Sequence, residues 1–256
     1  MNSVLFAIVN FTESTIHRST QLLKISIVLV SCGACAGCLN TDFANRDGLV
    51  TAAGRSSSEG VSKLSEEYRA NPDDTHVALA YSEALERSGN TDQSLAIARK
   101  ILIKQPQNKL VLARYGKALA AAGQYSMAID AMERAQTPDQ PDWRLLSAEA
   151  TVLDRVGDFD RARSLYERAQ TLAPKEPSII SNMGVSLMLS GDLPGAEANF
   201  RRAIAMNEVD PRTRENLALV VGLQKRYEEA RKLYSDILPA QQVEENMEYI
   251  SQIAKA

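Results

Sequence analysis

Apolar residues recur along most of this chain with the spacing of amphipathic helices, and the pattern repeats every 34 residues from residue 75 onward. Each unit holds two such segments with a short polar turn between them. Apolar residues three and four positions apart share one face of a helix, so each unit predicts two packed helices. The first helices are predicted at 75–88, 109–122, 143–156, 177–190 and 211–224. The second helices are predicted at 91–104, 125–136, 159–172, 193–206 and 227–238.

Two positions of the repeat hold only small residues, which predicts where the two helices of a unit cross. The eighth position holds Ser82, Gly116, Ala150, Gly184 and Ala218. The twentieth holds Ser94, Ala128, Ala162, Ala196 and Ala230. Helices approach closely only where neither carries bulk. Larger apolar side chains four residues later, among them Tyr166 and Phe200, are expected to fill the space around the crossing.

The turn between the helices is marked by glycine at the fifteenth position. The four glycines are Gly89, Gly123, Gly157 and Gly191. Glycine ends a helix by adopting the left-handed conformation at low cost. The fifth unit has Lys225 instead, which leaves a different turn open there. Prolines at the end of the unit, such as Pro106 and Pro174, stop the second helix.

These features together resemble the tetratricopeptide repeat, in which small residues, glycine, aromatic residues and proline recur with this period. The resemblance covers residues 75–242 and implies an all-α solenoid of about five helix-turn-helix units. The units are 75–108, 109–142, 143–176, 177–210 and 211–242. A degenerate helix precedes them and a capping helix at 243–254 follows, so the whole array is expected at 61–254. Capping helices shield the ends of such arrays.

The N-terminal segment has the layout of a secretory signal peptide: basic residues, a short apolar run at 25–30, then small residues. Its end, Ala36-Gly37-Cys38, resembles a bacterial lipobox, although Cys35 stands where leucine is usual. The resemblance implies a signal peptide at 1–38, lipid attachment to Cys38 and a flexible tether at 39–60. An uncleaved anchor is one alternative. A metal site at the three cysteines is another, but the segment offers no fourth ligand.

Composition and the absence of known motifs argue against nucleic-acid binding and against catalysis. The net charge of -3 gives no reason to expect nucleic acid as a partner. The chain has only two histidines, and neither a phosphate-binding glycine loop nor the usual zinc-protease or serine-hydrolase motif occurs. We therefore expect no catalytic residues, no metal and no cofactor. An enzyme would need a domain outside the repeats, and the residues outside the five units are too few to enclose an active site.

Protein binding is the function that remains. In tetratricopeptide repeats the first helix of each unit lines a concave groove, commonly through its second, fifth, sixth and ninth positions. The resemblance places six polar candidates there: Arg114, Lys117, Arg144, Asn182, Arg212 and Asn216. Asparagine amides can pair with an extended peptide backbone, and the cations suit an acidic or C-terminal carboxylate segment. The alternative is that the asparagines are ordinary consensus residues and the arginines are solvated.

Signal peptide, lipobox, tether and repeats together resemble the lipoproteins of the Flp/Tad pilus assembly system, the TadD family. That resemblance implies an outer-membrane lipoprotein that faces the periplasm, is held by its lipid anchor, and helps a secretin or other pilus components to assemble. The alternative is an adaptor lipoprotein for peptidoglycan hydrolases or synthases. Neither reading involves catalysis by this chain.

Overall fold

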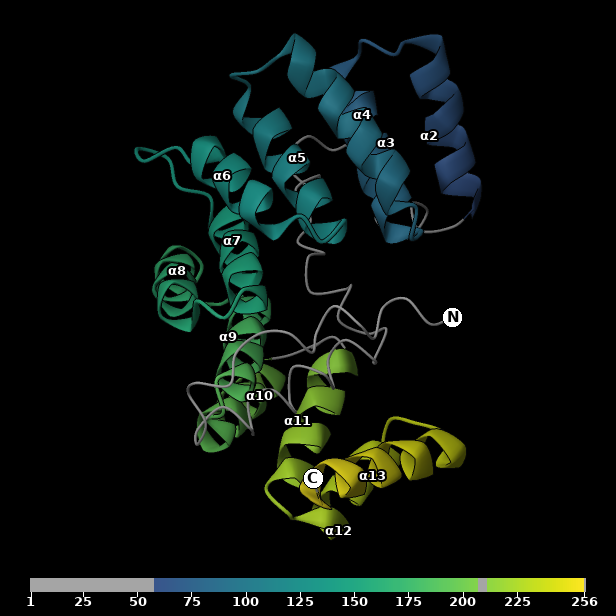
Figure 1. Ribbon diagram of the computed structural model, residues 1–256. Helices are drawn as coiled ribbons and strands as arrows, with labels where there is room; N and C mark the ends of the chain where they lie inside the picture. Colours follow the sequence, from purple (N-terminus) through teal and green to yellow (C-terminus); the bar gives the residue numbers. More distant parts are fainter. Residues whose placement is uncertain (1–57, 207–210, 256) are drawn as a thin grey trace, which may run out of the picture.

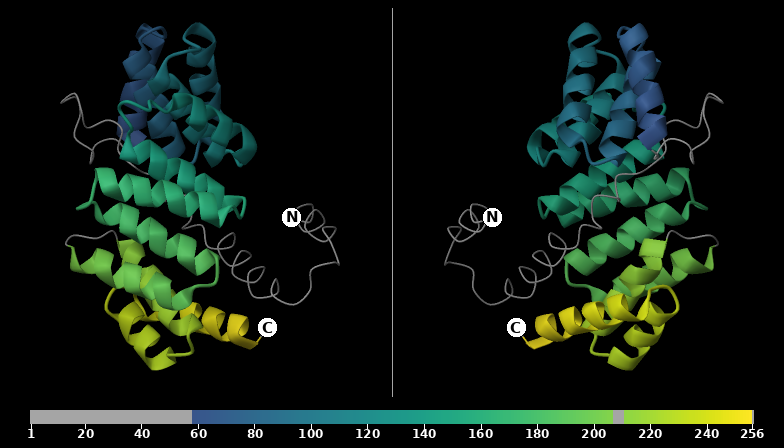
Figure 2. Two further views of the ribbon diagram at one scale, coloured as in Figure 1. Left: turned by 90° about the vertical axis from the view of Figure 1, so that its left-hand side faces the viewer. Right: turned by 90° about the vertical axis from the view of Figure 1, so that its right-hand side faces the viewer.

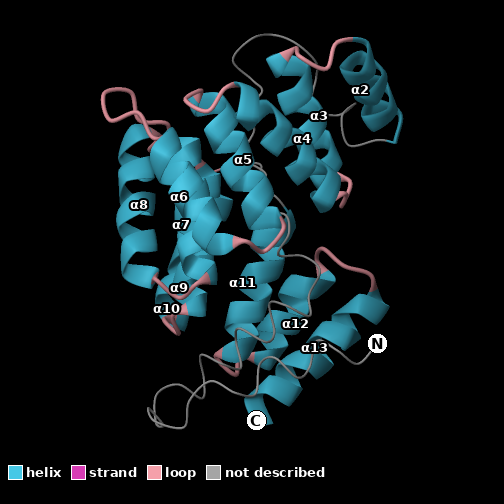
Figure 3. Cartoon of the chain, turned by 45° about the horizontal axis from the view of Figure 1, so that its top comes forward, coloured by secondary structure: helices cyan, strands magenta, loops and turns pink. Residues whose placement is uncertain are grey.

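The computed structural model describes residues 58–206 and 211–255, and within these ranges it consists of helices joined by loops and turns, without strands (Figures 1 and 3). The all-α prediction is confirmed. The predicted signal peptide, the lipobox with Cys38 and nearly all of the predicted tether lie outside the described residues.

The helices follow the repeat along the chain. The lead-in helix is α2 (Ser58–Ala70). First helices of the five units are α3 (Thr75–Arg87), α5 (Lys109–Ala121), α7 (Trp143–Arg155), α9 (Pro177–Leu189) and α11 (Pro211–Leu223). Second helices are α4 (Thr91–Lys104), α6 (Tyr125–Ala135), α8 (Phe159–Leu172), α10 (Leu193–Ala205) and α12 (Tyr227–Ser235). The terminal helix is α13 (Ala240–Lys255).

Differences from the predicted boundaries are confined to helix ends. Helix α2 begins at Ser58, so its first residues overlap the end of the predicted tether at 39–60. Helix α12 ends at Ser235, three residues before the predicted 238. Helix α13 begins at Ala240, three residues before the predicted cap. Side-chain periodicity locates helices well but does not fix where their last turns fray.

The units stack into a curved array that runs from α2 to α13 (Figures 1 and 2). Each first helix packs on the second helix of its own unit, and α3, α5, α7, α9 and α11 also contact one another in succession. Helix α8 lies on the outer side of α7 (Figure 1). The first helices therefore form a continuous inner layer, as in other solenoids of helix pairs.

Small residues allow the two helices of a unit to touch. A Cβ added to Gly184 would lie 2.7 Å from Cε1 of Phe200, so the ring of α10 packs directly on the backbone of α9. In the first unit, Ser82 and Ser94 approach so closely that their hydroxyl groups are 3.0 Å apart and hydrogen-bonded. The predicted crossing points are confirmed at both positions.

In all five units the turn between the two helices has a residue in the left-handed conformation at the same position of the repeat. The four glycines of this position have φ values of 81°, 74°, 81° and 90°, and Lys225 has φ of 67°. Lys225 also donates its backbone N–H to the carbonyl of Gly222, as Gly157 does to the carbonyl of Asp154. The fifth turn is therefore not different in conformation. It is the same turn made by a residue for which the left-handed region costs about 1–2 kcal/mol.

The first testable consequence is that Lys225→Gly stabilises the array. Relief of the left-handed strain outweighs the larger entropy of a glycine in the unfolded chain, for a net gain of about 0.5–1 kcal/mol. Gly157→Lys is the matched reverse change, because a Cβ at Gly157 meets no atom within 4 Å and only the backbone conformation resists it. Urea unfolding curves of the two variants should shift in opposite directions. Shifts in the same direction would contradict this account.

Helix α13 closes the C-terminal end of the array. Its Ile250 is fully buried, and a Cβ added to Gly222 of α11 would lie 2.6 Å from the Ile250 side chain. Val243 and Met247 of the same helix are buried with it, whereas Glu248 is exposed. The helix therefore presents one apolar face to the last unit and a polar face outward.

Candidate protein-binding groove

The six predicted groove residues lie on four successive first helices of the inner layer. Arg114 and Lys117 are on α5, Arg144 is on α7, Asn182 is on α9, and Arg212 and Asn216 are on α11. Helices α5, α7, α9 and α11 contact one another in this order. The fold thus brings the six residues to one layer, although they span about 100 residues of sequence.

The two cations of α5 are enclosed rather than solvated. Arg114 is 8% exposed and Lys117 is 4% exposed. Arg114 forms an ion pair with Glu86 of α3, which links the first two units. Burial lowers the pKa of Arg114 to about 10. Burial, and next the positive charge of Arg114, lower the pKa of Lys117 to about 7. Glu83 and Glu86 lie beside these cations. Their negative charges largely offset the positive charge that Arg114 and Lys117 were expected to give this end of the groove.

The other four predicted residues are more accessible. Arg144 is half-buried, with its guanidinium carbon 4.4 Å from the centre of the Trp143 ring. Asn182 is half-buried and donates from Nδ2 to Oγ of Ser147, at 3.2 Å. Arg212 is exposed and Asn216 is half-buried. The two asparagines thus lie one unit apart without being fully buried, and the partner-binding role of all six residues stays a prediction.

A buried polar network joins α7, α8 and α9. Asp154 of α7 accepts hydrogen bonds from the hydroxyl of Tyr166, at 3.0 Å, and from Oγ of Ser186, at 2.6 Å. Thr151 is hydrogen-bonded to the same Tyr166 hydroxyl, at 3.0 Å. Burial raises the pKa of Asp154 to about 6, although the hydrogen bonds from Ser186 and Tyr166 oppose the shift. Such a network fixes the register of neighbouring units, but it requires the ionisable carboxyl group of Asp154 to be buried, which costs stability when that group is charged.

Sequence reasoning missed this network, although the repeat contained a signal for it. At the twelfth position Asp154 stands where neighbouring units have Ala120 and Met188. At the tenth position Ser186 stands where they have Val152 and Val220. Two polar residues that break an apolar column in adjacent units indicate a hydrogen bond between those units.

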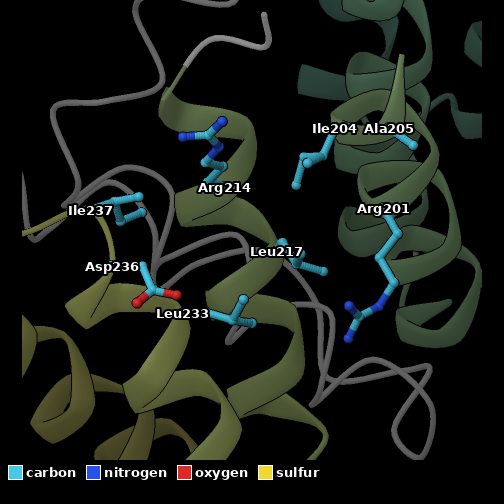
Figure 4. Close-up of a pocket in the computed structure, with 8 residues that line it drawn as sticks. All are labelled: Arg201, Ile204, Ala205, Arg214, Leu217, Leu233, Asp236 and Ile237. Atoms are coloured by element: carbon cyan, nitrogen blue, oxygen red, sulfur yellow. The ribbon is translucent and has the colours of Figure 1, made fainter. Parts of the chain in front are cut away.

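Outside the inner layer, the structure has a hollow between the fourth and fifth units (Figure 4). It has a volume of about 450 Å³. Its lining comes from α10, α11, α12 and the turn after α12, and it combines aliphatic side chains with three charged ones. The lining residues are Arg201, Ile204, Ala205, Arg214, Leu217, Leu233, Asp236 and Ile237. None of the six predicted groove residues lies in it.

Neither a metal-ligand cluster nor a membrane-spanning helix occurs among the residues that the structure describes. In residues 58–206 and 211–255, no three histidine, cysteine or acidic side chains are grouped as metal ligands would be. Within the same ranges no helix has the length and apolar character needed to cross a bilayer.

Comparison with known proteins identifies the repeat. Family models described as tetratricopeptide repeat match residues 82–142, 143–168 and 182–244, which together exceed half of the chain. The chain therefore belongs to the tetratricopeptide repeat proteins. No curated protein matches this sequence at a significant level.

Solved structures agree on the fold. A tetratricopeptide repeat protein from Parabacteroides merdae ATCC 43184 superposes with a TM-score of 0.65 at 12% identity, over 75% of this chain and 77% of that one. PilW, described as a widely conserved type IV pilus biogenesis factor, gives 0.63 at 13% identity, over 75% and 89%. A chain of the Cut9-Hcn1 hetero-tetramer of the APC/C gives 0.61 at 16% identity, over 72% and 36%. At these identities the likeness shows the fold alone.

Proposed function

We propose that this chain is a lipid-anchored, non-enzymatic scaffold that helps the secretin of an Flp/Tad pilus to assemble at the outer membrane. The observation that carries the proposal is the continuous inner layer of five first helices, with the half-buried Asn182 and Asn216 on adjacent units. Repeat arrays of this kind bind proteins along such a surface. The similarity in fold to PilW gives modest support to a role in pilus biogenesis.

The groove is tested by the double variant Asn182→Ala, Asn216→Ala. Each lost amide removes hydrogen bonds to a partner backbone, so we expect capture of the purified secretin to weaken by about 1–3 kcal/mol, roughly 5- to 150-fold. Asn199→Ala is the matched control, because Asn199 lies on the second helix α10 and its amide bonds the carbonyl of Gly195 in its own helix. Unchanged capture by the double variant, with native circular dichroism, would place the binding surface elsewhere.

Anchoring is tested by Cys38→Ser. The thiol is the only acceptor for diacylglycerol in the lipobox, so the variant should lose palmitate label and leave the membrane fraction. Cys35→Ser is the control and should stay labelled. If the wild type takes up no palmitate label and the Cys38→Ser protein remains membrane-bound with unchanged mobility, the lipoprotein assignment is wrong.

Deletion of the gene separates this function from the peptidoglycan alternative. Loss of surface pili with normal septation supports the proposal. Chained or lysing cells that keep their pili would instead favour an adaptor for peptidoglycan hydrolases or synthases.

A further inference from the structure

The hollow between the fourth and fifth units arises from one departure in the repeat. The fourth position of the first helix holds Leu112, Leu146 and Ile180 in the second to fourth units, and all three are fully buried. Leu112 belongs to an apolar cluster that includes Leu95 and Ala98 of the preceding unit, and Leu146 belongs to one against which Ile129 of the preceding unit packs. In the fifth unit this position is Arg214, which is exposed. The joint between the fourth and fifth units therefore lacks the aliphatic side chain that this position has in the three preceding units.

The floor of the hollow remains apolar without that side chain. Ile204 of α10, Leu217 of α11, Leu233 of α12 and Ile237, which follows α12, line it (Figure 4). Leu217 is buried, and the other three are only half-buried. A space of about 450 Å³ lies within the usual range for ligand pockets. It can accommodate one or two large aliphatic side chains.

Charge on the rim favours an acidic occupant. Arg201 is held by Glu197 and Glu229, with its Nη2 2.8 Å and 2.7 Å from their carboxylates. Arg214 has no ion pair or hydrogen bond through its side chain with any residue that the structure describes. Asp236 is the one acidic residue in the lining. An exposed guanidinium beside an apolar floor offers a bidentate contact to a carboxylate whose neighbouring side chain enters the hollow.

The hollow is separate from the groove. On α11, residues 214 and 217 lie roughly half a turn away from 216 and 219, at 100° per residue. Arg214 and Leu217 thus belong to the side of α11 that meets α10 and α12, opposite the side that carries the predicted groove residue Asn216. Occupation of one surface leaves the other open.

We propose that this hollow is a second docking site, which takes an acidic amphipathic segment of a partner protein. One or two large aliphatic side chains of the segment enter the space left by the missing aliphatic residue, and an adjacent carboxylate pairs with Arg214. The proposal extends the scaffold function by giving the chain two independent protein contacts. It requires only that the chain acts as a scaffold, not that its partner is a secretin.

The test uses the full chain and three synthetic peptides of about 14 residues. The first carries a leucine stripe flanked by glutamates, the second has lysines in place of the glutamates, and the third has serines in place of the leucines. Binding is followed by fluorescence anisotropy, and the site is located by methyl NMR of the isoleucine and leucine side chains. We expect the first peptide to bind and to shift Ile204, Leu233 and Ile237. The other two should bind about tenfold more weakly.

Variants separate the two parts of the site. Arg214→Ile restores the aliphatic residue of the neighbouring units, so it should fold, raise the unfolding temperature and weaken the first peptide about tenfold or more. Arg214→Gln keeps the hollow open but removes the charge, so it should abolish the preference for glutamate over lysine. Arg202→Gln changes an exposed arginine of α10 outside the lining and should have no effect.

Several results would overturn the proposal. One is equal binding of the first peptide to the Arg214→Ile protein. Another is a peptide that shifts resonances near Asn182 and Asn216 instead, which would leave the groove function intact. Concentration-dependent dimerisation that Arg214→Ile abolishes would assign the hollow to a second copy of this chain. Tight binding of laurate with the same NMR shifts would assign it to a lipid.

Discussion

Phe200→Ala is expected to destabilise the protein by about 3–5 kcal/mol. Phe200 is fully buried, and it packs on the backbone of α9 at Gly184, where no side chain exists to move into the vacated space. The same ring belongs to the apolar cluster that includes Leu217, Val221 and Ile250. Truncation therefore leaves a cavity at the junction of the last two units, and those units should unfold before the rest.

The measurement is urea unfolding followed by far-UV circular dichroism, with amide hydrogen exchange to locate the loss. In a repeat array each unit contacts only its neighbours, so exchange should accelerate in α9 to α12 and much less in α3 to α6. Tyr227→Ala is the control, because Tyr227 is an aromatic residue of α12 that is 38% exposed. Its cost should stay below about 1 kcal/mol. Equal costs at the two positions would contradict the proposed packing.

Much of the fold could be predicted from the sequence because its information is local and repeated. Small residues such as Ser82 and Gly184 mark the helix crossing in every unit, and glycines such as Gly157 mark the turn in four of the five. Five copies of one pattern average out the ambiguity of a single segment. Even Lys225, which departs from the pattern, has the backbone conformation that its place in the repeat indicates.

The site was less predictable, because it depends on contacts between units rather than on the pattern within one. The positions that commonly line the groove in tetratricopeptide repeats correctly placed Arg114 and Lys117 on a first helix of the inner layer. They did not reveal that both side chains are buried beside Glu86 of the preceding unit. The hollow at Arg214 likewise became visible only when the joints between successive units were compared. Both features arise where a residue differs from its counterparts in neighbouring units.

Asp154 shows how such a difference affects stability. Its carboxyl group lies between α7, α8 and α9, where it accepts from Tyr166 and Ser186. The charged groups that act on it are Arg155 of α7 and Arg163 of α8, and both lower its pKa only in part. No charged residue occurs within α9. Burial therefore dominates and raises the pKa from 3.8 to about 6.

The sign of the pH effect follows from this shift. Between pH 4 and 6 the folded protein binds a proton at Asp154 that the unfolded chain releases, so this carboxyl group favours folding less as the pH rises. At pH 7.5 the buried carboxylate is ionised and its full penalty of about 3 kcal/mol is present, whereas near pH 4 most of the penalty is absent. Asp154→Asn removes the titration but keeps a polar side chain of the same shape.

We therefore expect the stability of Asp154→Asn relative to the wild type to increase by about 2–3 kcal/mol between pH 4 and pH 7.5. Urea unfolding at half-unit steps of pH measures the difference directly, and other titrating groups cancel because both proteins contain them. Asp160→Asn is the control, because it makes the same chemical change at a side chain that is 98% exposed and so carries no burial penalty. A flat difference for Asp154→Asn would mean that the carboxyl group is solvated in the folded protein. The polar joint between the third and fourth units would then be open to water.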